Sequence, residues 1–213
     1  MTKIKICGLS RFEDVEAINR AKPDYCGFVV NYPKSPRNIS VEHLIELTKK
    51  VDSTIIPVGV FVDEPIKSIA ELLNLGIIGV AQLHGNEDES YVKALQSLAP
   101  GKSVWKAFTV RTTNDIQQAQ QSAADLVILD NGKGTGKPFC WKLAAQLQRP
   151  FMLAGGLTPE NLEQAEMALH PYGFDLSGGV ETFGIKDAEK ISRAVGAVKK
   201  FNLTYSNQPY QIH

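Results

Sequence analysis

Several side chains that can transfer protons stand at the ends of short apolar runs in this sequence. Thiol, imidazole and carboxyl groups are among the side chains that enzymes use as general acids and bases. If these runs end at one place in the fold, their last residues line a single site. The residues at or near such ends are Cys7, His84, Asp130, Asp175 and Ser177.

Each of these residues also has an ordinary structural use, so the chemical interpretation stays open at this point. A lone Cys on a strand is often a small buried apolar residue. An Asp at a strand end often caps the next helix, although the loop 131–138 that follows Asp130 makes simple capping less fitting. His84 could be a hydrogen-bonded structural histidine, and we expect no role for His43, His170 or His213.

Two glycine pairs indicate a site for an anion. Gly155-Gly156 follows the seventh apolar run, and Gly178-Gly179 follows the eighth. Backbone N–H groups can donate to an anion, and glycine lets the anion approach closely. Turn glycines without a ligand are the alternative for either pair alone. Their occurrence after both runs favours a phosphate site.

The glycine-rich segment 132–137 resembles a nucleotide-binding loop only superficially. The GxxxxGK spacing needs a glycine where Asn131 stands, and Pro138 replaces the Ser or Thr that would hold magnesium. A mobile lid at 131–138 is the better interpretation. HExxH and GxGxxG are absent, so we expect no metal ion and no cofactor.

The elements that must position these residues alternate between strand and helix. Strand-like runs cover 3–7, 25–30, 56–62, 79–84, 104–109, 126–130, 151–154 and 173–177, and helical patterns cover 13–21, 41–50, 66–75, 88–98, 114–122, 141–147, 160–169 and 187–199. Ser40 suits a helix N-cap, Pro65 and Thr158-Pro159 suit helix starts, and Gly76 suits a C′ position.

Eight such units predict a single α/β domain with a (β/α)8 barrel, because doubly wound open sheets usually stop at five or six strands. Barrel enzymes place their chemistry at the C-terminal strand ends, with phosphate sites frequently in the loops after strands seven and eight. The alternation of side chains along a strand turns Ile4 and Ile6 toward the helices. The same alternation turns Cys7 toward the barrel mouth, with Lys5 below it.

The composition is that of a globular protein. The chain has 213 residues, its 23 Lys+Arg balance 23 Asp+Glu, and 43% of it is hydrophobic. These values argue against disorder and nucleic-acid binding. No apolar run suits a membrane span or a signal peptide, and three separated cysteines fit a reducing, cytoplasmic setting. We expect a barrel domain at 1–201 and a tail at 202–213.

Seven stretches together match a family pattern. They are KICGL at 5–9, FVVNYPKSPRNIS at 28–40, VGVFVDE at 58–64, QLHGNE at 82–87, ILDNGKGTGKPFCW at 128–141, LAGGLTPEN at 153–161 and DLSGGVETFGIKD at 175–187. With these stretches the chain resembles the phosphoribosylanthranilate isomerases of tryptophan biosynthesis over residues 1–200. The resemblance implies an Amadori rearrangement of a small phosphosugar substrate, and it leaves the oligomeric state open.

The resemblance also implies a role for each candidate residue. It makes Cys7 the general base and Asp130 the general acid. It places Arg37 at the anthranilate carboxylate, with His84 and Asp175 lining the substrate. It assigns phosphate binding to Gly155, Gly156, Ser177, Gly178 and Gly179.

These roles need shifted proton affinities, because Cys ordinarily has a pKa of about 8.5 and Asp of about 3.9. Cys7 needs help toward the thiolate, for which Lys5 and the Gly8 N–H are candidates, and Asp130 must stay protonated. The chain departs from the family pattern at Gly178, where a serine hydroxyl is lost. It departs again at Cys140, where the loss of an Asp weakens a helix cap by about 1 kcal/mol.

Two other functions fit parts of the pattern. Another phosphosugar barrel, an epimerase or a synthase, would share the phosphate site. A non-catalytic barrel that binds a phosphate ligand would share it too. Cys7, Asp130 and Arg37 favour the isomerase, because neither alternative needs those three residues together.

Overall fold

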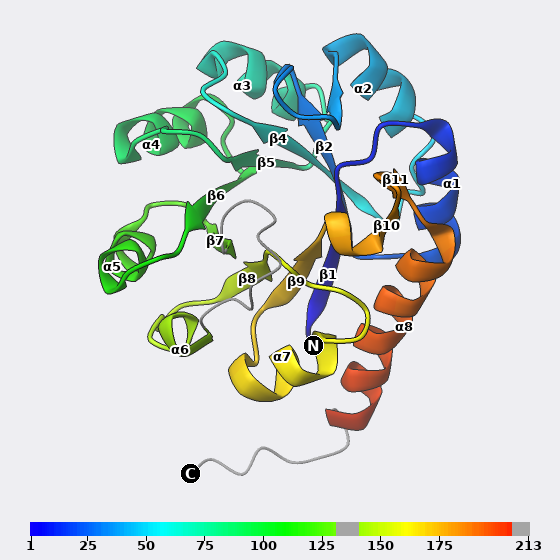
Figure 1. The fold of residues 1–213 in the computed structure, drawn as a ribbon. Helices are drawn as coiled ribbons and strands as arrows, with labels where there is room; N and C mark the ends of the chain where they lie inside the picture. The colour runs from blue at the N-terminus through cyan, green and yellow to red at the C-terminus, as the bar shows by residue number, and fades with distance from the viewer. Residues whose placement is uncertain (131–140, 206–213) are drawn as a thin grey trace.

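Within the residues that the structure describes, 1–130 and 141–205, eight parallel strands form a closed barrel with helices around it (Figure 1). The computed structural model joins the strands in the order β1-β9-β8-β7-β6-β5-β4-β2, and β1 pairs with β2 to close the ring. The predicted (β/α)8 barrel is confirmed. The barrel strands are β1 (Lys3–Cys7), β2 (Tyr25–Val30), β4 (Ile56–Phe61), β5 (Val80–Leu83), β6 (Ser103–Thr109), β7 (Leu126–Asp130), β8 (Phe151–Ala154) and β9 (Gly173–Leu176).

The helices lie where the sequence places them. Most of their ends differ from the prediction by one or two residues, but the sixth helix ends three residues earlier than predicted and the last one six residues later. At the start of the second helix the Ser40 side chain accepts a hydrogen bond from the His43 N–H, as an N-cap does. Gly76 follows the third helix with φ +70°, the left-handed conformation expected at C′. The helices are α1 (Phe12–Ala21), α2 (Val41–Thr48), α3 (Ile66–Asn74), α4 (Glu89–Leu98), α5 (Thr113–Gln121), α6 (Trp141–Ala144), α7 (Leu162–Leu169) and α8 (Ala188–Tyr205).

The start of α7 differs from the prediction. We expected Thr158-Pro159 to open this helix, but its first residue is Leu162. Asn161 explains the delay, because its Oδ1 accepts from the Thr158 N–H at 2.9 Å and its Nδ2 donates to the Gly156 carbonyl at 2.9 Å. These bonds hold the intervening residues in a turn beside the glycine pair.

Short elements also occur that leave no periodic signal in the sequence. A two-residue strand, β3 (Asn38–Ile39), extends the edge of β2. After β9 come a 3₁₀ turn, η1 (Gly178–Val180), and an antiparallel hairpin of β10 (Glu181–Thr182) and β11 (Ile185–Lys186). The hairpin turns through Phe183 and Gly184, both at positive φ. Positive φ at both central residues is the geometry of a tight two-residue hairpin turn.

Two layers of side chains fill the molecule. An outer layer between strands and helices contains Ile4 and Ile6, as the alternation predicted. An inner layer inside the barrel contains Tyr25, Val58, Val80, Trp105, Ala107, Leu126, Ile128, Met152 and Ala154. Lys5 is fully buried and lies on the opposite face of β1 from the isoleucines. The barrel interior is therefore a packed core that carries a buried cation.

The last described helix joins the two ends of the barrel sequence. Asn202 on α8 accepts from the Thr2 N–H at 2.7 Å and donates to the Thr2 carbonyl at 2.9 Å. The domain boundary that we drew at 201 therefore falls inside a helix, and residues 206–213 of the expected tail lie outside the described residues. None of the helices in the described part of the chain is long and apolar enough to cross a membrane.

Candidate active site

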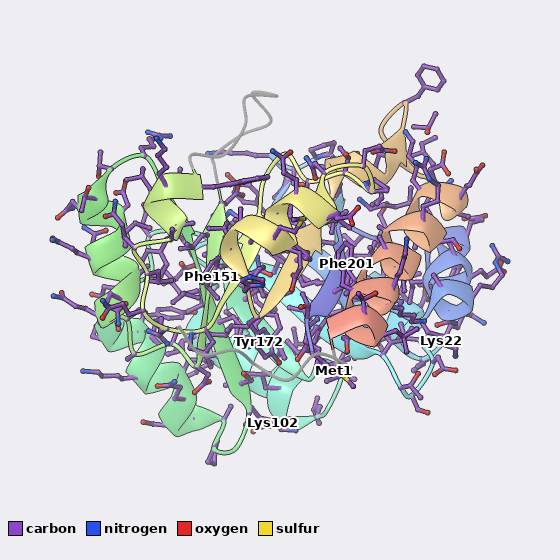
Figure 2. The ribbon with its side chains drawn as sticks, turned by 90° about the horizontal axis from the view of Figure 1, so that it is seen from below. Met1, Lys22, Lys102, Phe151, Tyr172 and Phe201 are labelled. Carbon is purple, nitrogen blue, oxygen red and sulfur yellow. The ribbon has the colours of Figure 1, made fainter. Side chains whose placement is uncertain are left out.

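The C-terminal ends of the strands meet on one side of the barrel and gather the predicted residues there. Met1, Lys102 and Tyr172 each lie just before a strand, and Figure 2 shows them toward the opposite side. Cys7 ends β1 and Asp130 ends β7. In the closed sheet β9 and β8 lie between these two strands, so the two residues stand three strand steps apart on the same rim.

Cys7 and Lys5 share a space that the neighbouring strand leaves open. A Cβ placed on Gly27 of β2 would lie 2.7 Å from the Cys7 Sγ and 3.0 Å from the Lys5 Nζ. Lys5 Nζ donates to Asp175 Oδ2 on β9 at 2.8 Å, with the Lys5 side chain fully buried. Asp175 Oδ1 is also buried and has no hydrogen-bond partner within the described chain.

Burial and charge act in opposite directions on the thiol. Burial raises the pKa of Cys7, Lys5 lowers it, and the net shift is upward. Burial also lowers the pKa of Lys5, but Asp175 and Cys7 outweigh it, so the pKa of Lys5 is raised and the amine stays cationic. The expectation that Gly8 helps is wrong, because its N–H donates to the Gly27 carbonyl at 2.8 Å. Among the described residues, Lys5 and, with a smaller effect, Lys186 lower the pKa of the thiol.

Across the mouth, His84 lies beside Asp130. His84 Nε2 is 3.9 Å from Asp130 Oδ2, and His84 Nδ1 is 3.4 Å from Gln82 Nε2. Burial lowers the pKa of His84, and the charge of Asp130 offsets this only in part. The imidazole is therefore neutral at pH 7. A Gln82 amide that donates to Nδ1 leaves the His84 proton on Nε2, the nitrogen nearer the carboxyl group.

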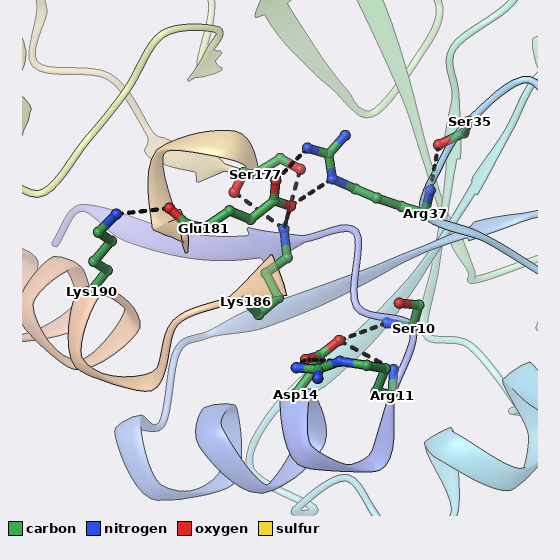
Figure 3. Close-up of polar contacts among 9 residues, drawn as sticks. All are labelled: Ser10, Arg11, Asp14, Ser35, Arg37, Ser177, Glu181, Lys186 and Lys190. Atoms are coloured by element: carbon green, nitrogen blue, oxygen red, sulfur yellow. Dashed lines mark hydrogen bonds and ion pairs between the residues drawn. The ribbon is translucent and has the colours of Figure 1, made fainter. Parts of the chain in front are cut away.

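Arg37 lies at the same rim and is already held by a carboxylate of the chain. It follows β2, and its Nε and Nη2 donate to the two oxygens of Glu181 at 2.6 Å each (Figure 3). Lys186 Nζ donates to Glu181 Oε1 at 2.5 Å and to the Ser177 carbonyl at 3.1 Å. Glu181 and Lys186 lie within one of the stretches that match the family pattern, but the sequence predicted no role for either. They lie in the hairpin of β10 and β11, which the sequence did not predict.

The two glycine turns touch each other. Gly155 and Gly156 adopt φ of +82° and +67°, a conformation that residues with a Cβ rarely adopt. A Cβ on Gly179 would lie 1.8 Å from the Leu157 carbonyl oxygen, whereas one on Gly178 would meet only Arg37 Nη2 at 3.8 Å. Gly179 therefore packs the turn after β9 onto the turn after β8, and Gly178 faces open space.

Gly8, directly after Cys7, lies against Arg37 and Ser177. Its φ is +81°, and a Cβ there would lie 2.3 Å from Arg37 Cδ and 3.1 Å from Ser177 Oγ. Arg37 and Ser177 thus flank the end of β1, directly after Cys7. The structure brings together all of the predicted site residues at one end of the barrel. The predicted lid at 131–138 and Cys140 lie outside the described residues.

A comparison with known protein families finds a match over nearly the whole barrel. A family model described as N-(5′-phosphoribosyl)anthranilate (PRA) isomerase matches residues 4–197. The chain belongs to the phosphoribosylanthranilate isomerase family. The resemblance inferred from the sequence is thereby confirmed.

Individual phosphoribosylanthranilate isomerases align over nearly the whole chain. The N-(5′-phosphoribosyl)anthranilate isomerase of Clostridium acetobutylicum is 39% identical over 210 residues, which cover 94% of this chain and 100% of that one. The crystal structure of the Thermotoga maritima enzyme has a TM-score of 0.85 at 32% identity and covers 94% of this chain and 100% of that one. A third structure, in complex with reduced 1-(o-carboxyphenylamino)-1-deoxyribulose 5-phosphate, has a TM-score of 0.82 at 31% identity with the same coverage.

Among residues 1–130 and 141–205 of this isomerase family member, no three His, Cys, Asp or Glu side chains come together in a way that could hold a metal ion. The charged groups at the rim pair with one another instead. Three cations (Lys5, Arg37 and Lys186) face two carboxylates (Asp175 and Glu181). The rim therefore carries one excess positive charge in these pairs.

Proposed function

We propose that the protein converts N-(5-phospho-β-D-ribosyl)anthranilate to 1-(2-carboxyphenylamino)-1-deoxy-D-ribulose 5-phosphate in tryptophan biosynthesis. The observation that carries this proposal is the placement of Cys7 and Asp130 on one rim, with both glycine turns on the strands between them. A phosphate on those turns puts the sugar between a base and an acid. The reaction needs no metal ion and no cofactor.

The rearrangement requires two proton transfers to the substrate and two from it. Asp130 donates a proton to the furanose ring oxygen, and the bond between C1 and that oxygen breaks to leave an iminium ion. Cys7 thiolate removes the C2 proton, and the electrons form the enolamine. Loss of the proton from the C2 hydroxyl and gain of one at C1 then produce the ketone. Each positioned acid or base typically contributes about 10²–10⁴-fold in rate.

The phosphate subsite is the pair of glycine turns. Gly155 and Gly156 N–H groups make no hydrogen bond within the described chain, so both are available as donors. Ser177, Gly178 and Gly179 supply the facing turn, and the Arg37 and Lys186 cations beside this turn favour an anion there. Gly178 leaves room where a serine hydroxyl could otherwise reach the anion.

The remaining predicted residues, Asp175 and His84, line the sugar together with Gln82, which we did not predict. Asp175 Oδ1 and Gln82 Oε1 are buried acceptors without partners within the described chain, and a buried acceptor is costly to leave unfilled. We assign both to ribose hydroxyl groups. His84, neutral and adjacent to Asp130, directs a proton-bearing nitrogen at the acid.

The deciding experiment is a fluorescence assay that follows loss of the anthranilate substrate with purified protein. Turnover confirms the proposal. Turnover of ribulose 5-phosphate with none of phosphoribosylanthranilate would instead identify another phosphosugar enzyme. Binding of a phosphate analogue in calorimetry without any product would identify a ligand-binding barrel.

We also place the enzyme in the cytoplasm. The proposal is supported by the need for a free Cys7 thiol, which a reducing compartment preserves. Fractionation of cells that express the tagged full-length chain tests it, and recovery with secreted proteins would contradict it.

A further inference from the structure

Glu181 is a buried carboxylate that the proposed reaction does not use. Its side chain is 7% exposed and both of its oxygens are engaged. Oε1 accepts from Arg37 Nε and Lys186 Nζ, and Oε2 accepts from Arg37 Nη2 (Figure 3). Burial raises the pKa of Glu181, but the two cations outweigh burial and the pKa is lowered. The group is thus a fixed negative charge at neutral pH.

The pairing leaves one edge of Arg37 unused by Glu181. A guanidinium group has five N–H donors in a rigid planar fork. Glu181 takes Nε and one hydrogen of Nη2. The other edge, formed by Nη1 and the second hydrogen of Nη2, can bind another carboxylate through two parallel bonds. Because the fork is planar, holding the first edge sets the direction of the second.

Lys186 connects this arrangement to the phosphate turn. Its amine is 2% exposed, and it bridges Glu181 Oε1 and the Ser177 carbonyl. Arg37 Nη2 would lie 3.8 Å from a Cβ on Gly178 in the same turn. One carboxylate therefore contacts both a candidate carboxylate receptor and the lysine that binds the Ser177 carbonyl, whereas the turn itself is also held by the packing of Gly179 on Leu157.

We propose that Glu181 is a positioning residue that fixes Arg37 relative to the phosphate turn, so that a ligand with both a carboxylate and a phosphate is held at two points. The proposal rests on the proposed function, since anthranilate supplies the carboxylate and the ribosyl group the phosphate. Glu181 itself contacts neither anion. Its effect is on the binding of the doubly anionic substrate, and a single phosphate ion does not need it.

A mutant cycle tests the proposal. The full-length wild type, Glu181→Gln, Arg37→Ala and the double variant are compared for KM and kcat with phosphoribosylanthranilate. Inorganic phosphate binding is measured by calorimetry. We expect Glu181→Gln to raise KM about 10-fold, as loss of a charge-assisted bidentate contact should, with kcat and the Kd for phosphate each within about 3-fold. On the Arg37→Ala background the same change should alter KM less than about 2-fold.

A different pattern is expected if the ion pair of Glu181 only stabilises the fold. Glu181→Gln would then lower kcat, weaken phosphate binding and change KM equally in the wild type and in Arg37→Ala. This result overturns the proposal. Asp52→Asn is the matched control, because it removes a carboxylate from the partly exposed Lys22–Asp52 pair, which lies before β4 and away from the rim; it should leave KM unchanged. If Glu181→Gln does not fold, Glu181→Asp is used with the same criteria, since it keeps the charge but shortens the side chain.

The outcomes also separate this proposal from the proposed function. An inactive wild type refutes the function. An active wild type with additive effects in the cycle refutes only the role of Glu181.

Discussion

The proton affinity of Cys7 depends on burial and on the charged groups around it. Burial and the Asp175 carboxylate raise the pKa of the thiol, and the Lys5 and Lys186 ammonium groups lower it without cancelling the rise. In the proposed reaction the base is the thiolate, so activity should increase with pH. The midpoint of the rising limb in the pH profile of kcat/KM should lie at a pH above the ordinary thiol pKa of about 8.5.

Replacing Lys5 with methionine should move that limb to higher pH. The substitution removes the larger of the two cationic contributions that lower the pKa of Cys7, so less thiolate is present at any given pH. Each unit of pKa shift costs about 10-fold in kcat/KM on the limb. The measurement is the pH profile of kcat/KM, with circular dichroism to verify folding. A limb that stays in place or moves to lower pH would show that Lys5 does not act on the thiol.

Removing either proposed proton-transfer group should abolish most turnover while the fold persists. We expect Cys7→Ala and Asp130→Asn each to reduce kcat by about 10²–10⁴-fold. Both residues are the last of their strands and lie at the rim, so the thermal midpoint should change little. Steady-state kinetics and thermal melts check this. Retained turnover in both variants would remove the acid–base assignment.

At the scale of elements, the paired glycine turns are the most constrained part of the site. Gly179 has no room for a Cβ because the Leu157 carbonyl oxygen would lie 1.8 Å away, whereas Gly178 faces open space. We expect Gly179→Ala to destabilise the fold by about 1–3 kcal/mol, as other overpacked sites do, and to weaken phosphate binding. Chemical unfolding and calorimetry measure the two effects.

Gly178→Ser is the matched variant in the same turn. Its Cβ is accommodated at 3.8 Å from Arg37 Nη2, and its hydroxyl adds a donor for the phosphate. Stability should be retained and the Kd for phosphate should fall by several-fold, since a net hydrogen bond contributes about 0.5–1.5 kcal/mol. Destabilisation equal to that of Gly179→Ala would contradict the packing described for the turn.

At the scale of the whole molecule, one residue joins the last helix to the first strand. Asn202 makes two hydrogen bonds with the backbone of Thr2, and β1 is the strand that closes the barrel and carries Cys7. Asn202→Ala should lower the free energy of unfolding by about 1–3 kcal/mol, with kcat/KM unchanged under stabilising conditions. Urea unfolding provides the value. Thr204→Ala, at an exposed position on α8, is the control and should have no effect.

The local signals in the chain predicted most of the elements. The eight barrel strands begin and end within one residue of the predicted runs, because each is a short β-branched or apolar run bounded by polar or small residues. The hairpin of β10 and β11 was missed because two-residue strands have no measurable alternation. The start of α7 was misplaced because Thr158-Pro159 satisfies the local rules for a helix start. Asn161 overrides those rules by bonding back to Gly156.

The sequence by itself determined the fold class, the family and the rim on which Cys7, Asp130 and the glycine pairs meet. These follow from periodicity and from short motifs, which are properties of neighbouring residues. The tertiary structure alone decided which groups neutralise one another: Lys5 with Asp175, and Glu181 between Arg37 and Lys186. These contacts join residues that are far apart in the chain or lie in an unpredicted hairpin. Charge pairing depends on distance in space, which only barrel closure establishes.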